Sequence, residues 1–143
     1  MQIDQLMTKD IKTVSPTDSV QQAASFMLNA DTGSIPVCEG DKLVGMITDR
    51  DIAVRGVASG KGGDCPVSEL MTQNVECARD TDDSLAVAQM MADKQVRRMP
   101  VLNQSDQLVG MVSLGDLARQ TSGAAADTAL EGVSAQGSLH QQG

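Results

Sequence analysis

Apolar residues recur at helical spacing in two stretches of the chain. Val20, Ala23, Ala24 and Met27 stand at positions i, i+3, i+4 and i+7. This spacing places them on one face and predicts a helix over 19–29. A second helix is predicted over 84–93, and two more are expected after Thr48, to about Ala58, and from Leu114 to about Gln120.

Short apolar runs bounded by turn residues predict the strands. They lie at 34–38, 43–47, 98–102 and 107–112, with briefer strands around 13–14 and 75–77. The order strand, helix, strand, strand, helix therefore occurs twice, and it predicts an α+β fold.

The chain repeats itself with an offset of 64 or 65 residues. Four blocks recur in the same order: LMT at 6–8 and 70–72, DSV at 18–20 and DSL at 83–85, IPV at 35–37 and MPV at 99–101, and LVGM at 43–46 and 108–111. Four matched blocks indicate an internal duplication.

The duplication divides the chain into four parts. We expect a first repeat over 1–58, a glycine-rich linker over 59–66, a second repeat over 67–120 and a flexible tail over 121–143. A repeat of this size buries little apolar area alone. The two repeats are therefore expected to pack sheet to sheet about a pseudo-two-fold axis, with a cleft between them.

One pattern occurs at the end of the last strand in both repeats. It reads GMITDRD at 45–51 and GMVSLGD at 110–116. In each copy a hydroxyl residue is placed to cap a helix, and an aspartate follows three residues later in the first turn. One copy would indicate only a helix start, whereas two copies at matching places suggest a shared function at the edges of the cleft.

Composition and net charge argue against several classes of binding partner. The formal net charge is −8, which disfavours nucleic acid and anionic membranes. Phe26 is the only aromatic residue, so no aromatic platform can stack nucleic-acid bases, and the nine methionines are expected to fill the core. A few local arginines could still bind a small phosphate ligand.

Cysteine and histidine usage gives no sign of a metal site or of catalysis. Cys38, Cys65 and Cys77 lack CxxC spacing, and the only histidine, His140, lies in the tail. No nucleophile and base can be paired in the folded region, so we expect a protein that is not an enzyme and has no metal or covalent cofactor. The N-terminus lacks a signal-peptide pattern and no apolar run is long enough for a membrane span, which predicts a cytoplasmic protein.

The duplicated LMT, DSV, IPV and LVGMITDRDI blocks resemble a tandem pair of cystathionine-beta-synthase (CBS) domains, a Bateman module, over about residues 3–120. The resemblance implies a regulatory module without catalytic activity. Such modules bind AMP, ADP, ATP, S-adenosylmethionine or sometimes NAD in the cleft between the repeats. They usually regulate an attached enzyme, transporter or channel; this chain looks like a stand-alone module whose regulated partner is unknown.

The resemblance also implies roles for individual residues. The ribose would be bound by Thr48, Asp51, Ser113 and Asp116, and phosphate by Arg97 and Arg98, with Arg50 as a further candidate. The place of the two arginines is held in the first repeat by Gly33 and Ser34, which carry no charge, so the two sites are expected to differ. The adenine ring would lie between Val14, Ile35, Val75 and Met99.

Each of these residues could also have a purely structural role. The hydroxyls and aspartates could serve only as helix caps, the arginines could be solvated, and the apolar residues would lie in the core in any case. A rival hypothesis therefore stays open: a ligand-free scaffold for protein interactions. We further predict a homodimer formed through exposed apolar faces of the helices over 19–29 and 84–93.

Overall fold

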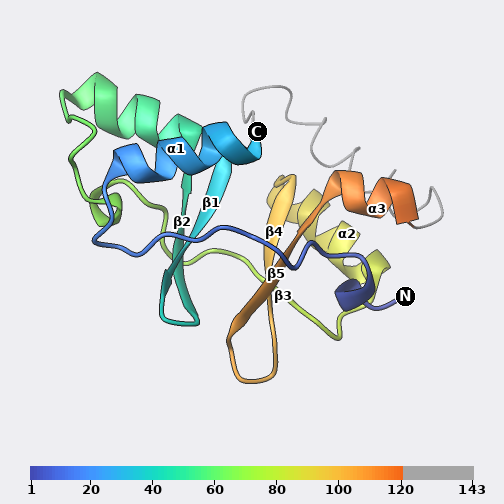
Figure 1. The fold of residues 1–143 in the computed structure, drawn as a ribbon. Coiled ribbons are helices and arrows are strands. Elements are labelled where there is room, and N and C mark those ends of the chain that lie inside the picture. The colour runs from blue at the N-terminus through green and yellow to red at the C-terminus, as the bar shows by residue number, and fades with distance from the viewer. Residues whose placement is uncertain (121–143) are drawn as a thin grey trace. The chain divides into compact units, whose positions relative to one another are not determined.

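The computed structural model describes residues 1–120, and these form two compact units. The first-repeat unit is Lys12–Val75; the second-repeat unit is Met1–Ile11 together with the described residues from Glu76 onward. Each unit has a small sheet covered by helices (Figure 1), so the fold is the predicted duplicated α+β arrangement. The mutual packing of the two repeats stays a prediction, and the tail over 121–143 lies outside the described residues.

The first-repeat unit is built on a β-hairpin. Strands β1 (Ser34–Glu39) and β2 (Lys42–Thr48) pair antiparallel, with a bulge between Val37 and Cys38. Helix α1 (Val20–Ala30) precedes them, within a residue of its predicted bounds. Ser19 caps α1 by accepting a hydrogen bond of 3.1 Å from the Gln22 amide.

The helix predicted after Thr48 is not a regular α-helix beyond its first residues. It continues as the π-helix η2 (Asp51–Gly56) and the 3₁₀-helix η3 (Val57–Ser59). Arg55 Nη1 donates to the carbonyls of Leu70 and Met71 at 3.1 and 3.3 Å. The π-helix thus occurs where Arg55 contacts residues that are distant in sequence. The spacing of apolar residues cannot predict such a contact, so the π-helix was not predictable from the sequence.

The second-repeat unit has a three-stranded sheet. Strand β4 (Arg98–Leu102) pairs parallel with β3 (Ala78–Arg79) and antiparallel with β5 (Leu108–Ser113). Helix α2 (Ser84–Lys94) lies between β3 and β4 in the sequence, and α3 (Leu114–Gln120) follows β5. These four longer elements agree with the predicted ranges to within about one residue.

The brief opening strand of each repeat was predicted wrongly. Around 13–14 there is only an isolated bridge between Val14 and Val37, and the strand expected at 75–77 is instead the two-residue β3. In both repeats a turn begins at once. The Ser15 amide donates to Asp18 Oδ2, and the Arg79 amide donates to Asp82 Oδ2, both at 2.9 Å. These turns leave no room for a longer strand.

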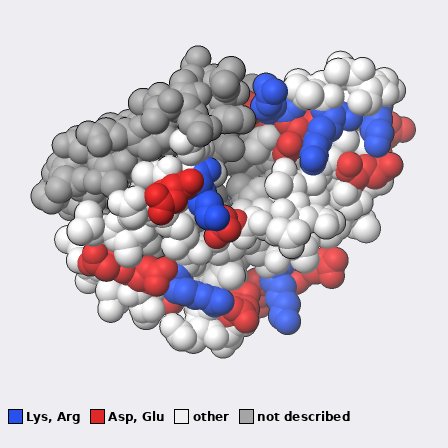
Figure 2. Space-filling view, turned by 180° about the vertical axis from the view of Figure 1, so that it is seen from behind, with Lys and Arg blue, Asp and Glu red and all other residues white. Residues whose placement is uncertain are grey.

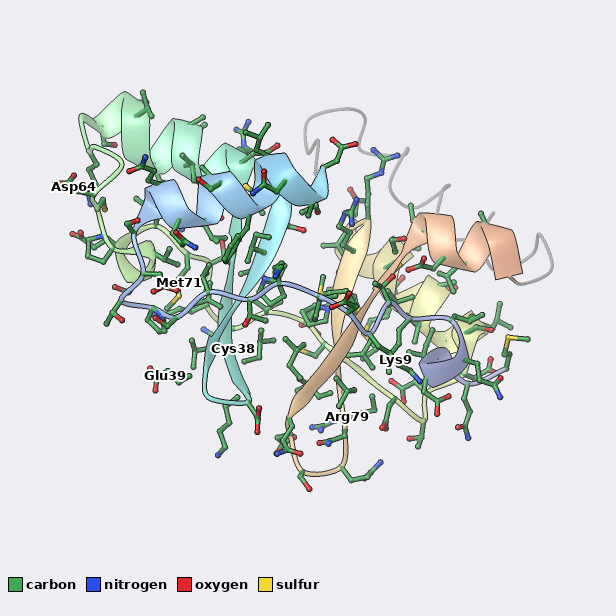
Figure 3. All side chains as sticks on the ribbon, in the orientation of Figure 1. Lys9, Cys38, Glu39, Asp64, Met71 and Arg79 are labelled. Carbon is green, nitrogen blue, oxygen red and sulfur yellow. The ribbon has the colours of Figure 1, made fainter. Side chains whose placement is uncertain are left out.

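The two LMT segments complete the sheets. Thr8 exchanges backbone hydrogen bonds of 2.8 and 2.9 Å with Met111 of β5, and Thr72 exchanges bonds of 2.8 and 3.0 Å with Met46 of β2. Met71 lies beside the hairpin of β1 and β2 (Figure 3). The LMT segment at 6–8 therefore belongs to the second-repeat unit, and the LMT segment at 70–72 belongs to the first-repeat unit. The predicted boundaries 1–58 and 67–120 assign each segment to the other repeat.

Short 3₁₀-helices lead into these segments. η1 (Ile3–Gln5) precedes the first LMT segment, and η4 (Val67–Glu69) precedes the second. Ile3 and Val67 are fully buried, one in each core, and so tie the segments to the units on which they dock.

The apolar faces of α1 and α2 are largely buried within their own units. Val20, Ala23 and Met27 of α1 lie in one core, and Val87 and Met91 of α2 in the other. The prediction that these faces are exposed for dimerisation is therefore wrong, because each small sheet needs its helix as a cover. The large apolar side chains left exposed on the two helices are Leu28 (81%) and Leu85 (53%).

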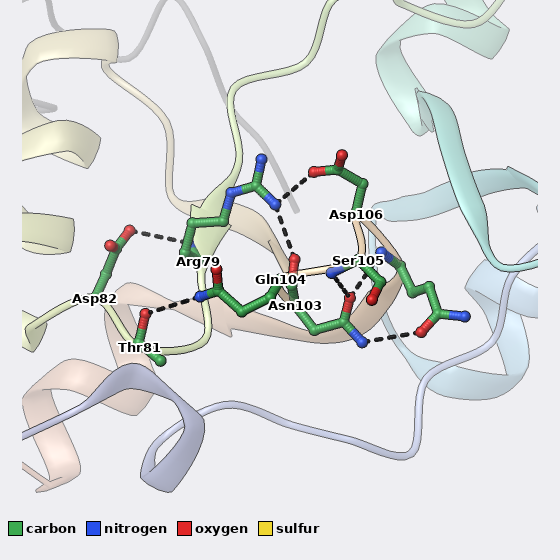
Figure 4. Close-up of polar contacts among 8 residues, drawn as sticks. Arg79, Thr81, Asp82, Asn103, Gln104, Ser105 and Asp106 are labelled. Carbon is green, nitrogen blue, oxygen red and sulfur yellow. Dashed lines mark hydrogen bonds and ion pairs between the residues drawn. The ribbon is translucent and has the colours of Figure 1, made fainter.

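A polar cluster joins the turn after β3 to the hairpin of β4 and β5 (Figure 4). Arg79 Nη1 donates to the Asn103 carbonyl at 2.8 Å and forms an ion pair with Asp106. Gln104 Nε2 donates to Thr81 Oγ1 at 3.5 Å. These contacts hold the hairpin tip against β3.

Candidate functional site

The first junction, residues 33–34 and 48–51, lies where β2 passes into η2. The Thr48 amide donates to Asp51 Oδ2, and the Asp51 amide donates to Thr48 Oγ1, both at 3.0 Å. This reciprocal pair is a capping box. It fixes the aspartate side chain against the strand end.

The second junction, residues 97–98 and 113–116, repeats this geometry where β5 passes into α3. The Ser113 amide donates to Asp116 Oδ2 at 2.9 Å, and the Asp116 amide donates to Ser113 Oγ at 3.1 Å. Asp116 is only 7% exposed. A carboxylate this buried is normally held by hydrogen bonds or ion pairs, and the capping box supplies two of the contacts that involve Asp116.

A backbone hydrogen bond ties the two parts of each junction together. The Asp49 amide donates to the Gly33 carbonyl at 2.9 Å, and the Leu114 amide donates to the Arg97 carbonyl at 3.0 Å. The start of the middle strand is therefore adjacent to the capping box in both repeats.

The strand register sets which side chains face the hydroxyl residues. Ser34 pairs with Thr48, and Arg98 pairs with Ser113. Directly opposed residues of an antiparallel pair place their side chains on the same face, with Cβ atoms about 5 Å apart. Arg98 is half-buried, whereas Arg97 and Arg50 are exposed. The structure thus brings Arg98 to the second capping box and Ser34 to the first.

The residues predicted to hold adenine lie mainly in the two cores. Val14 and Ile35 are buried in the first-repeat unit, and Met99 is buried in the second-repeat unit. Val75 is half-buried. Their packing alone accounts for their apolar character, and a role toward adenine stays a prediction.

The residue that sequence reasoning undervalued is Ser34, which was noted only for lacking charge. It is 8% exposed, and its Oγ has no hydrogen-bond partner among the described residues. Counting the hairpin pairs outward from the turn would place Ser34 opposite Ile47, and the bulge at Val37 and Cys38 shifts the register so that it pairs with Thr48 instead.

The thiols show no sign of reactivity. Burial, with a smaller contribution from Asp41, raises the pKa of Cys38 to about 11. Burial also raises the pKa of the Cys65 and Cys77 thiols. Within residues 1–120 no three histidine, cysteine or acidic side chains cluster as metal ligands would.

The described surface carries side chains of both charges (Figure 2). On the face drawn in Figure 2, basic side chains are interspersed with acidic ones and form no continuous basic field. None of the described helices has the length and apolar character needed to cross a bilayer.

Comparisons with known proteins identify the family of the chain. The CBS domain model matches residues 3–56 and 67–123. The CBS domain-containing protein YhcV of Bacillus subtilis is 44% identical over 131 residues, which cover 91% of this chain and 93% of that protein.

Two crystal structures extend the comparison. Hypoxic Response Protein I, solved with two coordinated zinc ions, has a TM-score of 0.78 and 30% identity, covering 85% of this chain and 100% of that one. The CBS domain pair of protein MJ0100, in complex with methylthioadenosine and S-adenosylmethionine, has a TM-score of 0.73 and 28% identity, covering 83% and 98%. The chain therefore belongs to the CBS domain family and carries a tandem pair of these domains.

Proposed function

We propose that this protein is a regulatory module that binds an adenosine-containing ligand at its strand-to-helix junctions. The observation that carries the proposal is the reciprocal Thr48–Asp51 and Ser113–Asp116 capping, built twice with one aspartate buried. The similarity to the MJ0100 pair, which holds two adenosine derivatives, supports it.

The carboxylates suit the vicinal hydroxyls of a ribose. An ionised carboxylate offers about four acceptor sites, and the amide of the capping box uses one of them. Asp51 can therefore accept further hydrogen bonds from the 2′- and 3′-hydroxyls, and Asp116 has the matching position. Because the capping box orients each aspartate beforehand, little ordering is required on binding.

The remaining parts of a nucleotide have candidate partners nearby. In this proposal Arg97 and Arg98 bind the phosphate, with Arg50 as an exposed third candidate. The apolar residues Val14, Ile35, Val75 and Met99 contact the adenine ring. AMP, ADP, ATP, S-adenosylmethionine and NAD all share the adenosine part that these groups would recognise.

The ligand would act by changing association with other proteins. An apolar groove of about 240 Å³ lies between α1 and the η2–η3 segment, and its walls include Val20, Ala24, Ile52 and Val57. Together with exposed Leu28, this groove gives the first-repeat unit an apolar surface suited to a second copy of the chain. We propose a cytoplasmic homodimer without catalytic activity, read by a protein partner yet to be identified.

The same apolar groove also favours the rival function, a scaffold that needs no ligand. Calorimetric titration with AMP, ADP, ATP, NAD and S-adenosylmethionine separates the two functions. The sensor requires at least one of them to bind with a dissociation constant below about 1 mM. If none binds in that range, the scaffold is the better account.

A further inference from the structure

We propose that the two junctions select adenosine ligands by charge. The first junction takes a nucleoside whose 5′ substituent carries no negative charge, and the second junction takes a 5′-phosphate. Of the three arginine candidates, only Arg97 and Arg98 then bind phosphate, and Arg50 does not. The inference rests on the proposed function and assigns a different ligand class to each of its two sites.

The summed side-chain charges of the two junctions have opposite signs. The first junction holds one arginine, Arg50, against two aspartates, Asp49 and Asp51. The second junction holds two arginines, Arg97 and Arg98, against the single Asp116. Since the capping hydrogen bonds and the strand pairing are the same in both, the charges decide: a phosphate is attracted to the second junction and repelled from the first.

The strand register strengthens this difference. Arg98 stands opposite Ser113, at the same pairing position that Ser34 takes opposite Thr48. A guanidinium makes charge-assisted hydrogen bonds to phosphate, whereas a serine hydroxyl can donate only one neutral hydrogen bond.

Ser34 itself indicates that the first junction is suited to a polar, uncharged group. Its side chain is more than nine-tenths buried, and Oγ has no partner among residues 1–120. An unsatisfied buried hydroxyl destabilises a protein, so a position that retains one calls for an explanation. A ligand hydroxyl or ether oxygen bound beside Thr48 would satisfy it once a change of the Ser34 side-chain rotamer turns Oγ toward the ligand.

The test is calorimetric titration of the full chain with AMP and with adenosine. For the wild type we expect AMP to bind once per chain, and adenosine to bind the AMP-saturated protein at the remaining junction. Arg98→Ser, which copies the first junction into the second, is expected to weaken AMP by at least about tenfold. Lys9→Ser removes the same charge from an exposed position outside both junctions, and should leave AMP affinity within about twofold.

Ser34→Ala gives an independent test. Alanine removes only the hydroxyl and adds no atoms, so the buried site does not have to accommodate a larger side chain. Loss of the unpartnered hydroxyl should leave the melting temperature unchanged or raise it. The affinity of the AMP-saturated protein for adenosine should nevertheless fall about fivefold, as expected for one hydrogen bond. A serine with only a structural role would not change that affinity.

The outcomes separate this inference from the proposed function. If neither AMP nor adenosine binds, the proposed function itself is wrong. If AMP fills both junctions equally, or Arg98→Ser weakens AMP and adenosine alike, the module still binds adenosine compounds but the selection by charge is refuted. An unchanged adenosine affinity in Ser34→Ala removes the role given to Ser34.

Discussion

Thr48 and Asp51 each satisfy a backbone amide of the other, through two hydrogen bonds of 3.0 Å. Ser113 and Asp116 have the same relationship, at 2.9 and 3.1 Å. The bonds make the aspartate part of the local fold before any ligand arrives. Substitutions at these positions must therefore distinguish a structural effect from a binding effect.

Asp116→Asn makes that distinction. The asparagine keeps a carbonyl oxygen for the Ser113 amide, so the melting temperature should change little. It loses the charge and acceptor capacity that a ribose requires, so nucleotide affinity should fall by at least about tenfold.

Asp116→Ala serves as the comparison. It also removes the acceptor of the Ser113 amide, while Ser113 Oγ still caps the amide of residue 116, and the lost half of the capping box should cost about 1 kcal/mol of unfolding free energy in addition to the lost affinity. Denaturant unfolding and calorimetry on both variants check the two effects. If Asp116→Asn binds nucleotide as the wild type does, Asp116 is only a helix cap.

Gly110 and Gly45 are required by the docking of the LMT segments. A Cβ atom at Gly110 would lie 2.8 Å from the Thr8 carbonyl oxygen, and one at Gly45 would lie 2.7 Å from that of Thr72. Since backbone atoms cannot move aside cheaply, alanine at either position should destabilise the protein by about 1–3 kcal/mol.

Gly63→Ala is the matched control for these glycines. A Cβ atom there would meet only the Gln21 side chain, at 3.4 Å, which is ordinary contact. Its unfolding free energy should lie within about 0.5 kcal/mol of the wild type. Equal effects at Gly63 and Gly110 would contradict the docking account.

Ser19→Ala tests the cap of α1. The substitution removes the acceptor for the Gln22 amide and should lower the free energy of unfolding by about 1 kcal/mol. Ser25→Ala, at an exposed position within the same helix, should be neutral or slightly stabilising. A smaller loss at Ser19 than at Ser25 would show that the cap is not formed.

The raised pKa values of the thiols predict that the protein loses stability in alkaline solution. The pKa of Cys38 rises from an ordinary 9.0 to about 11 in the folded protein, chiefly through burial. The folded state therefore holds its proton more tightly than the unfolded state does. Its contribution to stability is fully present below pH 9 and is lost as the pH rises toward 11.

Cys38→Val isolates this contribution, because valine fills a similar apolar volume and cannot ionise. The backbone bond from residue 38 to the Val14 carbonyl is retained. Urea unfolding from pH 8 to 11 should show a shallower alkaline decline in the variant, although Cys65 and Cys77 still contribute in the same direction. Identical declines would contradict the assigned pKa.

The elements that local pattern encodes were predictable from the sequence. Helix α1 follows from the spacing of Val20, Ala23 and Met27, and the β4–β5 hairpin from two apolar runs around a polar turn. The docking of Thr8 on Met111 was not predictable, because those residues lie far apart in the chain and share no local signal. The opening strands were overestimated for a related reason: turns anchored by Asp18 and Asp82 end them early.

Part of the candidate site was likewise predictable from the sequence, and part of it was not. The capping partners Thr48 and Asp51 are three residues apart, so a sequence pattern reveals them. The position of Ser34 opposite Thr48 depends on strand register through a bulge, and only the structure shows that its hydroxyl is buried without a partner.

The most direct test of the central claim is calorimetric titration of AMP and S-adenosylmethionine into the wild type and into the Asp51→Ala/Asp116→Ala double variant. The account predicts binding of at least one ligand below about 1 mM by the wild type, and a loss of at least about tenfold in the double variant. A far-ultraviolet circular dichroism spectrum checks that the variant stays folded. Equal affinities in a folded double variant would contradict the claim that these aspartates hold the ligand.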